Sequence, residues 1–313
     1  AAWMERLAGG AAAAALWTGL LAAAAGAQAR PVPVGTLPTT DAVVRTADVT
    51  LRGYTEADFP RITKIADNVY VYQSLQHQGE IEPVFTTNCF IVVTSAGVLV
   101  SDGLENEALD KELIGAIATL TREPIKYFVV GSDHPDHTGG NAAFPPPTTF
   151  FASTASIATM KRRAAAALAR NPAMPRPSRA IVYREITQPK TVLRLGNTEI
   201  QILNLGRAHT GGDLEVYLPA QKILWMSEVY FNRLYPSTYS GYPSEWVATL
   251  QKAEALRAWI YLPAHGFIDS RNVLNAELVN FRECLQNLVS EGYRLHDEKI
   301  PLDGAPRLAR LGH

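Results

Sequence analysis

Cysteine is scarce in this chain, which contains only Cys89 and Cys284. Neither belongs to a CxxC pair, so nothing in the sequence favours a cysteine-based metal or redox motif. Cys89 lies in "CFIVV", a pattern typical of a buried strand, and Cys284 lies in a helical pattern. The residues therefore leave two alternatives open, a disulfide or two separately buried thiols.

An excess of charge of either sign is also missing. The 29 Lys and Arg residues are balanced by 30 Asp and Glu residues, which excludes the electrostatic footprint expected for binding nucleic acid or an anionic membrane. We therefore expect a small-molecule substrate as partner and no nucleic acid. The oligomeric state is not encoded in any pattern that we recognise.

Long apolar runs are absent beyond the N-terminus. The segment "MERLAGGAAAAALWTGLLAAAAGAQA" has a basic residue near its start, an Ala- and Leu-rich run, and small residues at Ala27 and Ala29. This layout predicts a secretory signal peptide that starts at Met4 and is cleaved near Ala29. An uncleaved membrane anchor is the alternative, but four glycines interrupt the run. We expect an exported protein, periplasmic or secreted, with no stable membrane insertion after cleavage.

The rest of the chain alternates between patterns typical of strands and of helices. Apolar residues make up 47% of the sequence, enough for one large core or two smaller ones. We predict strands at 68–73, 89–103, 126–132, 148–153, 214–219, 222–228 and 260–266, a hairpin at 190–206, and helices at 105–123, 153–170, 244–258 and 270–295. These elements indicate a single α/β domain of two sheets with helices outside. The expected layout is a signal peptide (1–29), an N-terminal tail (30–65), a catalytic domain (66–297) and a C-terminal tail (298–313).

Imidazole and carboxylate side chains follow several of the predicted strands. Six of them stand in short loops just past a strand: His134, Asp136, His137, His209, Glu228 and His265. Six candidate ligands in equivalent places are improbable by chance, so we expect them to form one site. Zinc binds imidazole nitrogen and carboxylate oxygen readily, and a catalytic zinc site keeps one position for water.

Four motifs in this order resemble the metallo-β-lactamase superfamily: "SDHPDHTGGN", "GRAHTGGDLEVYLP", "ILWMSE" and "LPAHG". Asp102, which ends "VLVSD", matches the usual opening of that family. The resemblance covers about Asp67 to Ser270. It implies an αββα sandwich, two mixed sheets flanked by helices, with the metals at one edge between the sheets.

The resemblance also implies a role for each site residue. The family motif H-x-H-x-D-H falls on residues 132–137, with Ser132 in place of the first histidine. One metal position would draw on residues 132, 134 and 209, and the other on Asp136, His137 and His265. The bridging aspartate of the family is replaced here by Glu228.

Three interpretations of these departures stay open. They are a single metal in the intact position of Asp136, His137 and His265, an asymmetric metal pair in which Glu228 compensates for Ser132, and loss of function. The expected cofactor is one or two Zn²⁺ ions, with iron or manganese as alternatives. Asp136 is expected to bind metal and to orient the attacking water. If His134 and His209 hold no metal, they are candidate proton donors.

Substrate determinants are weaker. The family places substrate loops at positions that correspond here to 73–88 and 229–246. We expect substrate contacts from His77, Arg233, Tyr230 and Tyr235, against the alternative that these side chains pack the loops onto the sheet.

The function expected from the sequence is an exported, β-lactamase-like zinc hydrolase that cleaves a lactam, lactone or (thio)ester-type bond. The alternatives are a mononuclear iron oxygenase or redox protein on the same fold, and a non-catalytic metal-binding protein.

Overall fold

The structure, a computed structural model, describes residues 31–76 and 85–311. The predicted signal peptide, its cleavage site at Ala29, and His77 lie outside the described residues. Across the described ranges, no helix combines the length and the apolar character needed to cross a bilayer.

The first sheet has eight strands that follow one another in chain order. They are β1 (Val34–Thr36), β2 (Arg61–Ala66), β3 (Val69–Gln76), β4 (Phe85–Thr94), β5 (Gly97–Ser101), β6 (Ile125–Val129), β7 (Thr149–Ser153) and β8 (Tyr183–Ile186). The pairs from β2 to β5 are antiparallel and those from β5 to β8 are parallel, so this sheet is mixed.

The second sheet has five strands in the order β13-β12-β11-β10-β9. Their bounds are β9 (Lys190–Leu195), β10 (Thr198–Leu203), β11 (Glu215–Leu218), β12 (Ile223–Trp225) and β13 (Ile260–Leu262). The β9–β10 hairpin turns at Gly196 and Asn197 as predicted, and Gly196 has a φ of +57°, which favours glycine. Strand β13 returns parallel to β12, so this sheet is mixed as well.

The helices are α1 (Glu107–Leu120), α2 (Pro135–Thr138), α3 (Thr154–Arg170), α4 (Pro243–Ala255), α5 (Arg271–Asp297) and α6 (Ala305–Leu308), with 3₁₀ turns η1 (Glu56–Asp58), η2 (Asn141–Ala143) and η3 (Ser227–Val229). The three longest helices, α1, α3 and α5, begin where the sequence supplies a capping residue. The Asn106 side chain accepts hydrogen bonds from two backbone N–H groups in the first turn of α1. Ser153 and Ser270 cap α3 and α5, and each hydroxyl accepts a hydrogen bond from one backbone N–H group.

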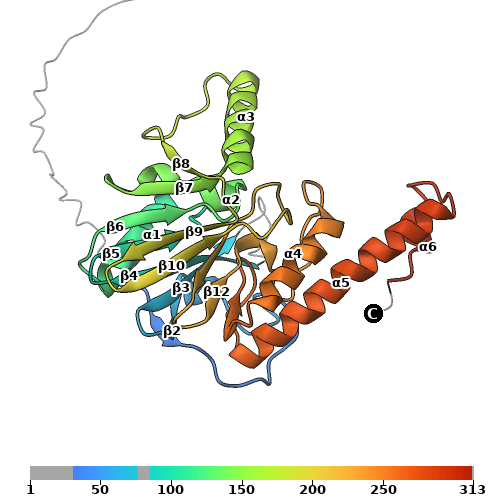
Figure 1. The fold of residues 1–313 in the computed structure, drawn as a ribbon, viewed down its shortest axis with the longest axis horizontal. Coiled ribbons are helices and arrows are strands. Elements are labelled where there is room, and N and C mark those ends of the chain that lie inside the picture. Colours follow the sequence, from blue (N-terminus) through green and yellow to red (C-terminus); the bar gives the residue numbers. More distant parts are fainter. Residues whose placement is uncertain (1–30, 77–84, 312–313) are drawn as a thin grey trace, which may run out of the picture. The chain divides into compact units, whose positions relative to one another are not determined.

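Three large apolar layers, each between two rows of elements, make up most of the core of the described residues. Along β4, Phe90 and Val92 face the layer between the two sheets, whereas Cys89 and Ile91 face the layer beneath α1. This alternation is the two-residue period of a strand that is buried on both faces. Helices α4 and α5 cover the outer face of the second sheet through a third layer (Figure 1). The fold is therefore the predicted pair of mixed sheets flanked by helices.

Some details differ from the sequence-based expectations. The single strand predicted at 89–103 is a hairpin of β4 and β5, because Ser95 and Ala96 form a tight turn between two apolar runs. The expected N-terminal tail contributes β1 and nearly all of β2 to the first sheet, and α6 lies in the expected C-terminal tail. Both cysteines are free thiols, so the disulfide alternative is wrong.

Trp225 ties the core to the loop that carries the candidate ligands. Its ring stacks on Phe90 with a centroid separation of 5.6 Å, and its Nε1–H donates to Asp102 Oδ2 at 3.1 Å. Asp102 is fully buried and also accepts from the backbone N–H groups of Gly131 and Ser132. The tryptophan therefore helps to fix a carboxylate that holds the loop after β6.

We predict that Trp225→Phe lowers the free energy of unfolding by about 2–3 kcal/mol, because Asp102 Oδ2 loses a buried donor and the core loses ring area. Trp259→Phe is the control, since Trp259 is 38% exposed, and we expect it to cost less than about 0.5 kcal/mol. Urea denaturation of both variants measures the difference. Equal losses of unfolding free energy in the two variants would show that Trp225 contributes no more to stability than an exposed tryptophan.

Candidate metal centre

The six candidate ligands come together from four separate loops. Residues 134–137 follow β6, His209 follows β10, Glu228 lies in η3 after β12, and His265 follows β13. Two groups result, one of Asp136, His137, Glu228 and His265, and one of His134, His209 and Glu228. Glu228 belongs to both groups. In each group, the atoms that could bind a metal lie within 4.8 Å of one another.

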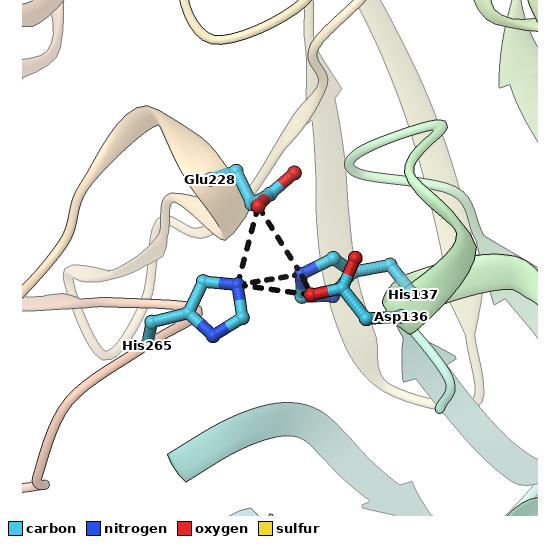
Figure 2. Close-up of side chains that lie close together, drawn as sticks. All are labelled: Asp136, His137, Glu228 and His265. Atoms are coloured by element: carbon cyan, nitrogen blue, oxygen red, sulfur yellow. Dashed lines mark hydrogen bonds and ion pairs between the residues drawn. The ribbon is translucent and has the colours of Figure 1, made fainter. Parts of the chain in front are cut away.

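In the first group, four side chains point at one another (Figure 2). The Nε2 atoms of His137 and His265 are 3.0 Å apart, and Asp136 Oδ2 lies 3.6 and 3.4 Å from them, respectively. Glu228 Oε1 lies 3.7 Å from His137 Nε2 and 3.2 Å from His265 Nε2.

These separations fit the donor set of a tetrahedral metal ion. Four ligand atoms placed 2.0–2.2 Å from a zinc ion lie about 3.3–3.6 Å from one another. The five distances in the first group run from 3.0 to 3.7 Å. Two imidazole nitrogens and two carboxylate oxygens are also the donor types that zinc binds.

The second group uses both oxygens of Glu228, including the Oε1 atom that faces the first group. His134 Nδ1 lies 2.8 Å from Glu228 Oε2, and His209 Nε2 lies 3.3 Å from Oε1. Ser132 is fully buried, and its hydroxyl donates to Glu228 Oε2 at 2.5 Å. The serine thus orients a carboxylate, which its hydroxyl does far better than it would bind zinc directly.

Neighbouring groups set the orientation of the ligands. His265 Nδ1 lies 3.1 Å from the backbone carbonyl of Thr86, which can only accept, so Nδ1 carries the proton and Nε2 offers a lone pair to the cluster. The loop around His265 is held by β4, because Asn88 donates to the carbonyls of Pro263 and Gly266 at 3.0 and 2.9 Å. Ser227, beside Glu228, has a φ of +48°, a strained conformation that re-aims the chain at the end of β12.

Buried acids and glycines hold the loops themselves. Asp213 accepts from the N–H and the hydroxyl of Thr210 at 2.8 and 2.6 Å and so fixes the turn after His209. Its burial raises its pKa to about 6. A Cβ at Gly139 would lie 1.8 Å from the carbonyl oxygen of Glu105, and one at Gly212 would lie 2.3 Å from Ser153 Oγ. The glycines of the two TGG motifs therefore allow close packing of these loops.

The carboxylates and imidazoles shift one another's pKa. Burial acts to raise the pKa of Glu228, but His209, His137 and His134 outweigh it and hold that pKa well below its usual value. Burial acts to lower the pKa of His137, but Asp136 and Glu228 outweigh it and raise that pKa to about 10. The cluster therefore binds positive charge strongly, whether protons or a metal ion.

The three residues expected to take part in catalysis occupy different positions in the cluster. Asp136 is the more exposed of the two carboxylates, with 17% of its side chain accessible against 3% for Glu228. His134 is also partly exposed, and its Nε2 lies 3.1 Å from Ser240 Oγ. His209 is buried against Trp246 and Phe231. Asp136 and His134 are therefore the members that a bound substrate or water reaches first.

The residues expected to contact substrate lie elsewhere. Tyr230 is fully buried in the third core layer and donates to the carbonyl of Leu274, which leaves no surface for a substrate. Arg233 pairs with Glu277 at 3.1 Å and lies 3.8 Å from Asp269. Tyr235 is 54% exposed and lines a separate cavity of about 710 Å³ with Arg233. For Tyr230 and Arg233, these contacts agree with the alternative that the side chains pack the loops onto the sheet and do not contact substrate.

Sequence reasoning missed Thr86, Ser240 and Asp213, which contact the ligands or hold the loops that carry them. Thr86 and Ser240 leave no signal in a single sequence, because each contacts a histidine far away in the chain. Asp213 follows the second TGG motif closely, and that spacing is a usable signal for an acid that caps the loop after His209.

Curated relatives of the chain are enzymes of one kind. No family model matches the sequence. The chain is 24% identical over 219 residues to a metallo-β-lactamase type 2 from Bacillus cereus, and 22% identical over 221 residues to one from Bacillus sp. strain 170. Each match covers 68% of this chain and 79% of the relative.

Solved structures of metallo-β-lactamases share the fold. The enzyme from Pontibacter korlensis superposes with a TM-score of 0.56 and 21% identity, over 71% of this chain and 98% of that one. The mono-zinc form of the FIM-1 enzyme from Pseudomonas aeruginosa superposes with a TM-score of 0.58 and 18% identity, over 77% of this chain and 98% of that one. With its two mixed sheets, the chain has the fold of these enzymes, and its ordered motifs and its curated and structural neighbours consistently indicate the metallo-β-lactamase superfamily.

Proposed function

We propose that this protein is an exported, zinc-dependent hydrolase that cleaves a lactam, lactone or (thio)ester-type bond in a small molecule. The observation that carries the proposal is the donor set around Glu228, in which four histidines contact one buried carboxylate. Such a set is costly to assemble in a protein interior unless a cation or protons compensate its charge. The curated relatives named as metallo-β-lactamases support hydrolysis as the reaction class.

We further propose that the two groups form an asymmetric pair of metal positions that share Glu228. Asp136, His137, His265 and Glu228 would hold one ion, and His134, His209 and Glu228 a second. Ser132 supports this pair, because its hydroxyl fixes Glu228 Oε2 on the side of His134. Glu228 is one methylene longer than the aspartate that the family resemblance implies. It would therefore extend toward the metal position for which Ser132 supplies no imidazole.

When bound, the metal supplies Lewis acidity, which lowers the pKa of water and polarises a carbonyl oxygen. The protein contributes position and proton transfer. Asp136 is the accessible carboxylate of the cluster, so it orients the attacking water and accepts a proton from it. When only the position of Asp136, His137 and His265 holds a metal, His134, partly exposed and beside Ser240, is placed to donate a proton to the leaving group.

Export remains part of the proposal on the evidence of the N-terminal sequence alone. A mature N-terminus at Arg30, found by N-terminal sequencing of the protein from the culture medium or periplasm, is the expected result. Full-length protein retained in the cell contradicts export without affecting the proposed reaction.

The first test combines metal analysis with a substrate panel. We expect the purified protein to contain zinc and to hydrolyse at least one member of a panel of lactams, lactones and thioesters. Asp136→Asn should lower kcat/KM by at least about 100-fold, because it removes a ligand charge and the proton acceptor. Asp303→Asn, a change at an exposed acid, is the control and should leave kcat/KM unchanged. Iron with oxygen consumption, or tightly bound metal with no turnover, would overturn the hydrolase assignment.

The second test concerns Ser132. We predict that Ser132→Ala weakens binding of the more weakly held zinc ion by about tenfold, because a neighbour that orients a ligand is worth about 10–100-fold in metal affinity. Competition with a chromogenic chelator measures the two dissociation constants. Ser101→Ala is the matched control, since Ser101 is equally buried and donates to the carbonyl of Val129 instead. Identical zinc affinities in both variants would show that Ser132 does not support zinc binding.

The third test is proton release. Because Asp136 and Glu228 raise the pKa of His137 to about 10, the imidazole is protonated at pH 7.5, and a metal ion must displace that proton. Zinc binding at pH 7.5 should therefore release about one to two protons, and zinc affinity should rise with pH until about pH 10. Calorimetric titrations in buffers of different ionisation enthalpy count the protons. Zinc binding without proton release would contradict the coupling between these groups.

A further inference from the structure

A cavity of about 770 Å³ opens beside the metal centre, and His134 belongs to both. The Nδ1 atom of His134 faces Glu228 Oε2 at 2.8 Å, and its Nε2 atom lies 3.1 Å from Ser240 Oγ on the cavity side. The remaining walls come from α3, from the loop at 207–211 and from the loop at 239–242. A molecule in this cavity therefore lies against a candidate ligand of the metal centre.

Three arginines line this cavity, which we call the arginine cavity, and only one buried acid accompanies them. Arg163 forms an ion pair with that acid, the carboxylate of Asp133, at 3.6 Å, and also donates a hydrogen bond to the backbone carbonyl of Asp133. Arg207 is engaged with Glu245, and its Nε–H donates to Glu245 Oε2 at 2.8 Å.

The third arginine, Arg162, has no acidic partner. Its guanidinium donates to Thr159 Oγ1 at 2.9 Å, and within residues 31–76 and 85–311 no carboxylate lies within ion-pair distance of it. The side chain is exposed near the middle of α3, on the side of the helix that borders the cavity. An arginine with a free fork of N–H donors is suited to bind a carboxylate, sulfonate or phosphonate through two parallel hydrogen bonds.

Aromatic rings provide an apolar surface next to these charges. The Arg207 guanidinium lies 4.1 Å from the centre of the Tyr242 ring, and the backbone N–H of Tyr242 donates to Ala208 at 2.8 Å. These contacts fix Tyr242 as a wall of the cavity. Tyr239 is fully exposed at the same cavity. The lining thus combines a free cation with ring surfaces, which suits an anion carried on an apolar or aromatic body.

We propose that the arginine cavity binds the anionic group of the substrate, with Arg162 as the residue that recognises it. This inference rests on the proposed function for the reaction, but the binding of an anion is a property of the cavity alone. It narrows the substrate class to hydrolysable small molecules that carry a carboxylate, sulfonate or phosphonate group on an apolar body. Arg162 then determines specificity through substrate binding.

The binding arm of the test uses benzoate, benzenesulfonate and phenylphosphonate, with benzamide as the neutral probe. Dissociation constants are measured by NMR titration of the protein with its metal, so that all variants share the same metal centre. We expect at least one anion to bind more tightly than benzamide, and Arg162→Gln to weaken that binding by about tenfold. The comparison among the three anions identifies which anionic group fits.

Lys161→Gln is the matched control, because Lys161 is the neighbouring exposed cation on α3 and does not line the cavity. It removes the same charge and should leave anion binding within about twofold. Equal losses in Arg162→Gln and Lys161→Gln, or equal binding of benzamide and all three anions, would overturn the proposal.

The kinetic arm uses a hydrolysed ester in two forms, one with a free carboxylate and one with that carboxylate methylated. We expect Arg162→Gln to raise KM for the anionic form about tenfold with little change in kcat, and to leave the methylated form unaffected. An equal rise in KM for both forms would contradict recognition of the anion. Anion binding without hydrolysis of any substrate would overturn the hydrolase assignment and leave the arginine cavity intact, so the two failures are distinguishable.

Discussion

The interaction on which this molecule depends is the burial of Glu228 among four imidazoles. Its two oxygens contact different histidines, and Ser132 fixes one of them with a short hydrogen bond. A buried carboxylate is tolerated only where partners compensate its charge, so the loops after β6, β10 and β13 must all close around η3. The carboxylate therefore connects the edges of both sheets. Trp225, three residues before it in the chain, donates a hydrogen bond to Asp102 and so connects the metal centre to the core.

Much of this arrangement could be predicted from the sequence, because strands leave strong local patterns and the ligands follow them. His134, His209 and His265 each stand just past an apolar, β-branched run, and the ends of neighbouring strands meet at one edge of a sheet. The order of the four motifs then indicates the topology, because the same order is typical of the metallo-β-lactamase superfamily that they resemble. Strands β1, β2 and β8 escaped prediction. β1 and β8 are short, and their exposed residues lack an alternating apolar pattern, whereas β2 lies in the segment interpreted as an N-terminal tail.

The part that could not be predicted depends on contacts between distant residues. Ser132 and Glu228 each look like an isolated departure from a motif, and only the fold places them 2.5 Å apart, 96 positions from one another in the chain. The same holds for Lys161, Arg162 and Arg163 on α3, because three consecutive basic residues in a helix carry no local sign that some of them line a cavity. Packing of α3 beside residues 133 and 134 brings Arg162 and Arg163 to the cavity, whereas Lys161 stays outside it.

The charge of the metal centre and the role of Arg162 depend on one another. With one divalent ion, the two carboxylates Asp136 and Glu228 cancel its charge, and the centre offers no net attraction to an anionic substrate. A free arginine is then the main source of attraction at this edge of the protein. With two ions the centre carries a net positive charge and attracts an anion by itself, so the contribution of Arg162 to substrate binding becomes smaller. The number of metals that Glu228 supports therefore decides how far anion recognition depends on α3.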